Sequence, residues 1–158
     1  MGKNRELHLI SDRADAIQLY LWQLRDLMGL GRWDVYLGAK RAPKGCLASV
    51  LPCEGRAVAN VSVSKHWWDL PAHEQRDTLV HELIHLVHRD QTDLIRCAAM
   101  HGLDRTTYRV LWEAHRLATE VMVDHLTSII APTMPLPDFS DTPTATLNAQ
   151  ASETTEEQ

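Results

Sequence analysis

Residues 79–87, which read LVHELIHLV, decide how this chain folds. Leucine, isoleucine and valine recur there at the i, i+3, i+4 and i+7 spacing of a helix with one buried face. Pro71 suits the first turn of such a helix, and His88 and Arg89 suit its last turn. We therefore predict a helix from about Pro71 to Arg89 that lies in the interior of the protein.

Two histidines in this stretch, His81 and His85, have the spacing of a metal-binding pair. Four residues are slightly more than one helical turn, so both imidazoles project from the same face. Burying them with the carboxylate of Glu82 would cost free energy, which a bound metal ion offsets. Zn²⁺ suits such ligands, and Glu82 would act as general base for a water at the open position of the metal. The alternative is that HExxH is a chance match and that both histidines are ordinary core residues.

The third zinc ligand is expected on a long helix near the C-terminus, from about Thr106 to Ile130. A zinc site with two histidines and one position open for water needs one more protein ligand. We predict Glu120 as this ligand, because the residues around it are apolar and indicate burial: Ala118, Val121, Met122 and Val123. Asp124 follows four residues later on the same face and is expected to orient one of the two histidines.

The sequence also offers other candidates for the third zinc ligand. Glu113 lies one heptad before Glu120 and is an alternative third ligand. His115 and His125 are candidates of lower rank for the same role.

The remaining elements predict a single α+β domain. Ser11 and Asp12 are typical helix N-caps, and the apolar spacing after them indicates a helix that ends near Met28. Three strands are predicted, over residues 33–37, 46–51 and 56–64. Residues 52–55, Pro-Cys-Glu-Gly, join the last two as a hairpin, so we expect a small antiparallel sheet. A short helix near 92–100, a break at Gly102 and the long C-terminal helix complete the α+β order.

The net charge of −5 comes from the C-terminal end of the chain. From Pro132 onward there are five acidic residues and no Lys or Arg, which leaves 16 acidic residues to match the 16 Lys and Arg. This end has too little apolar surface to fold, so we predict a domain over residues 1–131 and a disordered acidic tail over 132–158. A neutral body with an acidic tail lacks the basic patch of a nucleic-acid-binding protein.

Length and composition favour one soluble domain. A chain of 158 residues with 44% hydrophobic residues can bury one core and has no room for two ordinary domains. No apolar run is long enough to span a membrane, and the polar start lacks the h-region of a signal peptide, so a cytoplasmic protein is expected. Three cysteines, an odd number, argue against a disulfide framework.

The motif and its setting resemble a known class of zinc enzymes. Residues 81–85, HELIH, followed by Glu120 and Asp124 on a second helix, are similar to the gluzincin pattern of zinc metallopeptidases. The predicted sheet before this helix resembles the minimal peptidase domains of bacterial and phage genomes, such as the ImmA/IrrE-like group. Residues 129–132, Ile-Ile-Ala-Pro, are similar to the apolar run and proline that end the third-ligand motif of that group. The resemblance covers roughly Trp33 to Pro132.

The resemblance implies a zincin-like fold and hydrolysis of a peptide bond in a protein or peptide substrate. Zinc would be held by His81, His85 and Glu120, and Glu82 would pass the proton of the attacking water to the leaving amine. The strand over 56–64 is expected to be a sheet edge that holds an extended peptide by main-chain hydrogen bonds. Such families often add a His or Tyr that stabilises the oxyanion, and this chain offers three candidates: His101, Tyr108 and His115.

Two other functions remain open on the same residues. Residues 45–49, GCLAS, are similar to the Gly-Cys-Leu-Ser segment of peptide deformylases, so a metal amidase that uses Cys46 as a ligand is one alternative. That family has Asp where Ile84 precedes the second histidine here. The other alternative is a non-catalytic, metal-stabilised binding protein whose interaction surface includes Trp67-Trp68 or the acidic tail.

Overall fold

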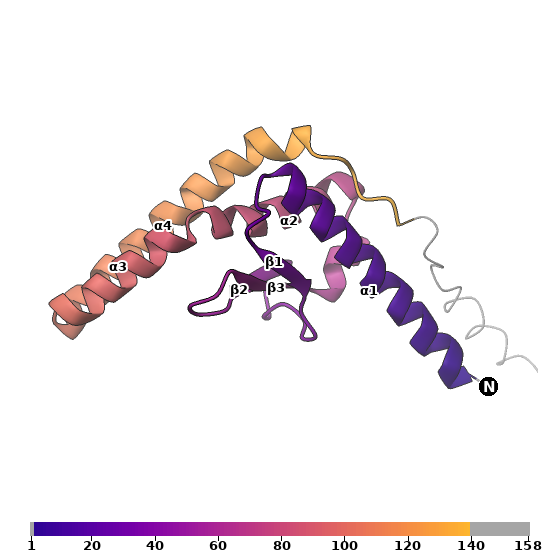
Figure 1. Cartoon of the computed structure of the whole chain (residues 1–158), viewed down its shortest axis with the longest axis horizontal. Coiled ribbons are helices and arrows are strands. Elements are labelled where there is room, and N and C mark those ends of the chain that lie inside the picture. The colour runs from indigo at the N-terminus through magenta and orange to yellow at the C-terminus, as the bar shows by residue number, and fades with distance from the viewer. Residues whose placement is uncertain (1, 140–158) are drawn as a thin grey trace, which may run out of the picture.

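The structure is a computed structural model that describes residues 2–139, with side chains from residue 13 onward. Its strands are β1 (Asp34–Leu37), β2 (Ala48–Pro52) and β3 (Val58–Val63). Its helices are α1 (Gly2–Leu27), α2 (Ala72–Val87), α3 (Arg89–Gly102) and α4 (Arg105–Ile130), with two 3-10 helices, η1 (Lys65–Asp69) and η2 (Ala131–Thr133). Helices come before and after a small sheet (Figure 1), so the predicted α+β class is confirmed.

The bounds differ from the predicted ones mainly in α1 and α3. The first helix begins at Gly2 and not at Ser11, because residues 3–10 are rich in good helix formers that continue the helix upstream of the predicted cap. The third begins at Arg89, directly after α2, and is longer than the predicted 92–100. In Figure 1, α3 and α4 lie side by side and extend away from the sheet as a helical hairpin.

The sheet is mixed, and the prediction of a purely antiparallel sheet was wrong. Its strand order is β1-β3-β2, with β2 antiparallel and β1 parallel to β3. The β2–β3 hairpin has the predicted turn, where Gly55 adopts a φ of +69° that favours glycine. Residues 38–47 are a longer connection, which lets the chain cross from β1 past β3 before it enters β2.

The strand predicted as the peptide-binding edge is the central one. Both sides of β3 are paired, so residues 56–64 cannot accept an added strand, and this prediction was wrong. The free edge next to α2 belongs to β2. Cys53 and Val58 are a hydrogen-bonded pair, with Cys53 N donating to Val58 O at 2.8 Å. Hydrogen-bonded and non-hydrogen-bonded pairs alternate along an antiparallel ladder, so the backbone N–H and C=O groups of Ala48, Val50 and Pro52 point away from β3, toward the free edge, except that Pro52 has no N–H.

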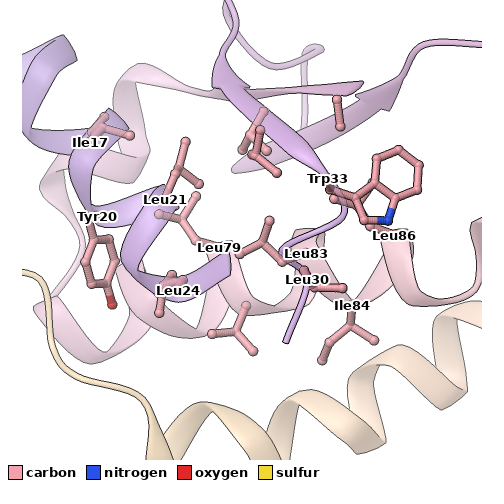
Figure 2. Packing of buried hydrophobic residues seen from close by; sticks show 14 of the residues in the cluster. Ile17, Tyr20, Leu21, Leu24, Leu30, Trp33, Leu79, Leu83, Ile84 and Leu86 are labelled. Atoms are coloured by element: carbon pink, nitrogen blue, oxygen red, sulfur yellow. The ribbon is translucent and has the colours of Figure 1, made fainter. Parts of the chain in front are cut away.

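The core lies between α1, the sheet and α2, as Figure 2 shows. The apolar face of α2 is fully buried: Leu79, Val80, Leu83, Ile84 and Leu86 are all 0% exposed. This confirms that residues 79–87 form an interior helix. Leu21 and Leu24 of α1 meet this face, and Val35 and Val61 come from the strands.

A buried amide fixes the start of α2 against η1. The side-chain nitrogen of Gln75 donates to the carbonyl oxygens of Trp67 at 3.2 Å and Trp68 at 3.3 Å. The indole nitrogen of Trp67 donates in return to the Gln75 carbonyl at 3.2 Å. Because buried polar groups are costly unless hydrogen-bonded, these reciprocal bonds hold the entry to α2 in one orientation. Trp67 is therefore a core residue, 0% exposed, and is not part of an exposed interaction surface.

The first residues of the predicted acidic tail, 132–139, pack against the rest of the domain. The Tyr20 hydroxyl donates to the Pro135 carbonyl at 2.7 Å, and the guanidinium of Arg76 donates to the Met134 carbonyl at 3.4 Å. Phe139 lies with its ring centroid 5.9 Å from that of Trp67. The remainder of the predicted tail, residues 140–158, lies outside the described residues.

Two of the helices are long enough to cross a bilayer. Both α1 and α4 have 26 residues, where about 20 suffice for a membrane-spanning helix. Their charged and polar residues interrupt every long apolar window. Within residues 2–139, no helix combines the length and the apolar character of a membrane span.

Substitution of Leu83 by alanine tests the interior position of α2. Because the side chain is fully buried, Leu83→Ala should lower the free energy of unfolding by about 3 kcal/mol. Val87→Ala, one turn later, is the matched control and should cost no more than about 1 kcal/mol, because Val87 is 52% exposed. Urea denaturation followed by circular dichroism measures both. Equal effects of the two substitutions would contradict the burial of this face.

Candidate metal centre

Three side chains predicted as zinc ligands converge between α2 and α4. The Nε2 atoms of His81 and His85 lie 3.2 Å apart on the face of α2 that is turned toward α4. Glu120 of α4 places its Oε2 atom 3.6 Å from the first of these nitrogens and 3.8 Å from the second. The three candidate ligand atoms thus lie within 4.8 Å of one another.

These separations fit the donor set of a tetrahedral zinc ion. Zinc binds imidazole nitrogen and carboxylate oxygen at about 2.0–2.2 Å, which puts tetrahedral ligands roughly 3.3–3.6 Å from one another. The measured 3.2, 3.6 and 3.8 Å are close to this spacing. The two imidazoles are 23% exposed, so the group is reachable from solvent and is not sealed in the core.

Asp124 lies where the sequence predicted an orienting carboxylate. Its Oδ1 atom is 3.2 Å from Nδ1 of His81, the ring nitrogen that faces away from Glu120. A carboxylate at this nitrogen favours the tautomer with the proton on Nδ1, which leaves Nε2 free to bind a metal.

Burial affects the second histidine in the direction that a metal ligand needs. Desolvation lowers the pKa of His85, and the negative charge of Glu120 opposes this effect. A lower pKa keeps the imidazole neutral near physiological pH, and neutral imidazole is the form that coordinates metal ions.

Glu82 lies beside the ligand group at the free edge of the sheet. Burial raises the pKa of its carboxyl group, while His81 and a hydrogen bond from the backbone N–H of Val50 act to lower it. The negative charge of Glu120 raises it further. A carboxylate with a raised pKa is a stronger base, which suits a group that accepts a proton from water.

A cavity of about 790 Å³ opens over these residues. Ala48, Ser49 and Val50 of β2 form one wall of the cavity together with residues 45–47 before them, and α2, α3 and α4 line the other sides. The end next to α3 is lined by polar and aromatic side chains that sequence analysis did not assign to the site: Arg89, Thr92, Trp112, Arg116 and Thr119. Nothing in the sequence pattern distinguishes them from ordinary helix-surface residues.

The alternative ligands do not join the group. Cys46 lines the cavity, but its sulfur is not among the ligand atoms that converge in the described part of the chain. Glu113 instead pairs with Arg116 at 3.1 Å. His115 lines the cavity, with its Nε2 3.4 Å from the Thr92 hydroxyl, whereas His125 is exposed.

The other oxyanion candidates lie outside the cavity. His101 is exposed at the end of α3, and Tyr108 stacks on Trp112 with ring centroids 6.3 Å apart. Of the three side chains named from the sequence, only His115 lines the cavity.

The expectation that Glu120 sits in a buried part of α4 was wrong. Its side chain is 42% exposed, and Val121 next to it is 71% exposed. Val123 is the buried residue of α4, because one narrow side of this helix contacts α2. Of the apolar residues around Glu120, Ala118, Val121 and Met122 are therefore exposed and Val123 alone is buried, and the glutamate lies at the border between this exposed surface and α2.

No family model, curated protein or solved structure matches this chain. The resemblance to gluzincins therefore rests on the residues of the motif and on their arrangement.

Removal of the Asp124 carboxylate should weaken metal binding without abolishing it. Loss of such an orienting partner typically costs about 10–100-fold in metal affinity, so Asp124→Ala should raise the dissociation constant for zinc by that factor. Competition with a chromophoric zinc chelator measures it. Glu113→Ala removes a carboxylate about three turns before Asp124 on the same helix. It is the control and should leave the zinc affinity unchanged. A weaker site in Glu113→Ala alone would transfer the ligand role to that residue.

Proposed function

We propose that this chain is a zinc-dependent metallopeptidase of the zincin type. The proposal is based on the convergence of His81, His85 and Glu120 with Glu82 beside them, in the lining of a cavity that a sheet edge also lines. Two imidazoles, one carboxylate and an adjacent base are the protein groups that hydrolytic zinc sites use.

Each of these groups has a defined task in the proposed hydrolysis. A zinc ion held by the three ligands would supply a Lewis acid that acidifies water and polarises a carbonyl oxygen. Glu82 accepts the proton of the attacking water and delivers it to the amine as the peptide C–N bond breaks. Asp124 keeps the His81 ring in the orientation and tautomer that point Nε2 toward Glu120.

The free edge of β2 supports a peptide as substrate. The Val50 N–H is used by Glu82, which leaves the N–H and C=O of Ala48 and the C=O of Val50 for an added strand. An extended peptide can bind such an edge by main-chain hydrogen bonds. Pro52 has no N–H, so the edge offers no donor at that residue. The substrate would therefore be held mainly beside residues 48–50, next to the base.

The metal amidase is a less favoured proposal on these contacts. It needs the Cys46 thiol among the ligands, whereas in the described residues the ligand-type atoms within 4.8 Å of one another belong to His81, His85 and Glu120. If the chain is instead a non-catalytic binding protein, substitution of Glu82 should leave its properties unchanged, because a purely structural metal site does not need a base.

Glu82→Gln tests the proposal directly. The substitution keeps the size of the side chain and removes the base, so cleavage should fall by about 10²–10⁴-fold while zinc content stays unchanged. Newly formed N-termini in a mixture of unfolded proteins, identified by mass spectrometry, report cleavage without knowledge of the substrate. Glu74→Gln, in the first turn of α2, is the matched control and should cleave like the wild type.

Two results would contradict the peptidase proposal. Zinc-loaded wild type that produces no new N-termini beyond those of the Glu82→Gln protein would favour the binding protein. Equal cleavage by all three proteins would assign the hydrolysis to another site or to a contaminant.

A further inference from the structure

A second cavity, of about 480 Å³, lies away from the metal centre between α1, the segment after β1 and η1. Its rim carries four cationic side chains that come from three parts of the chain: Arg13, Lys40, Arg41 and Lys65. Asp69 is the acidic residue among the lining side chains, and it is 80% exposed. In a chain whose body is nearly neutral, this is a local excess of positive charge.

The four cations have no carboxylate partner among residues 13–139, where side chains are described. Six arginines elsewhere in that part do form ion pairs, Arg25, Arg32, Arg76, Arg89, Arg96 and Arg116, whereas Arg56, Arg105 and Arg109 do not but lie apart from this cavity. Arg13 instead lies over the Trp68 ring, 5.3 Å from its centroid. Like charges gathered around one cavity repel one another, and an anionic ligand would relieve that repulsion.

The aromatic lining of this cavity favours a peptide over a nucleotide as the ligand. Trp68 is the aromatic side chain that lines the cavity, and Arg13 already covers its ring. Its other neighbours are Trp67 at 5.2 Å and Phe139 at 5.5 Å between ring centroids. A base therefore has no free ring to stack on, and stacking is a main source of affinity for single-stranded nucleic acid.

The chain itself brings carboxylates to this place. Phe139 contacts Trp68, and the residues beyond it contain Asp141, Glu153, Glu156 and Glu157 but no Lys or Arg. A residue spans at most about 3.6 Å, so the length of the chain alone limits the distance between the Cα atoms of Phe139 and Asp141 to roughly 7 Å. The stretch from Phe139 to Glu153 is long enough to reach any part of the rim.

We propose that this cationic cavity binds an acidic peptide segment, and that the segment is residues 141–157 of the same chain. Tethering raises the effective concentration of the segment to the millimolar range, so contacts that are individually weak suffice. Salt screens such contacts, which makes the association sensitive to ionic strength. This inference does not depend on the metal or on hydrolysis.

Carbodiimide cross-linking of the full-length protein tests the proposal, because it joins a carboxylate to a lysine only when they are in contact. Peptide mapping by mass spectrometry should find Asp141 or Glu153–Glu157 joined to Lys40 and Lys65. Lys44 is the internal control, since it is exposed on the same segment as Lys40 but does not line the cavity. An equal mixture of isotope-labelled and unlabelled protein separates links within one chain from links between chains.

The expected result is a set of links within one chain that favours Lys40 and Lys65 over Lys44 and is lost at about 1 M salt. Arg41→Gln should lower their yield about two- to fivefold, whereas Arg56→Gln, on the β2–β3 turn, should not. Equal labelling of Lys44, the absence of links, or links only between chains would each overturn the proposal. The last result would assign the cavity to the acidic segment of a second copy.

Discussion

The burial of one face of α2 is the constraint on which the rest of the structure depends. Leu79, Leu83 and Leu86 are fully excluded from solvent against α1 and the sheet. Once this face is fixed, helical geometry leaves His81 and His85 on the side toward α4 and Glu82 toward the free edge of β2. The same helix therefore completes the core and positions the candidate site, so a change in its orientation would affect both.

The position of α4 depends both on apolar packing and on the polar contacts of the candidate site. Val123 is its buried residue, and its polar contacts with α2 are made by Glu120 and Asp124. Two imidazoles and two carboxylates at 3.2–3.8 Å therefore add polar contacts to the apolar packing of Val123, Leu126 and Ile130 against the core. A metal ion at this place would stabilise the α2–α4 arrangement as well as supply reactivity.

The sequence predicted the elements built on local patterns and missed those that depend on long-range pairing. A spacing of four residues suffices to place His81 and His85 together, and another four relates Glu120 to Asp124. The partner of β1 could not be predicted, because an alternating pattern shows one apolar face but not which strand lies beside it. Nor could the exposure of Val121 be predicted, because apolar periodicity on α4 indicates a face without showing what covers it. The hydrogen bond from the Val50 N–H to the Glu82 carboxylate could not be predicted either, because it requires β2 at the sheet edge and α2 packed beside it.

The most direct test of the metal site is the zinc content of purified protein, measured by elemental analysis for the wild type, Glu120→Ala and Cys46→Ser. A zinc site built from His81, His85 and Glu120 should give about one zinc ion per chain in the wild type and in Cys46→Ser, and a loss of stoichiometric zinc in Glu120→Ala. Retention of zinc in Glu120→Ala with loss in Cys46→Ser would contradict the assigned ligand set. A wild type that binds no zinc when the metal is supplied would contradict the metal centre itself.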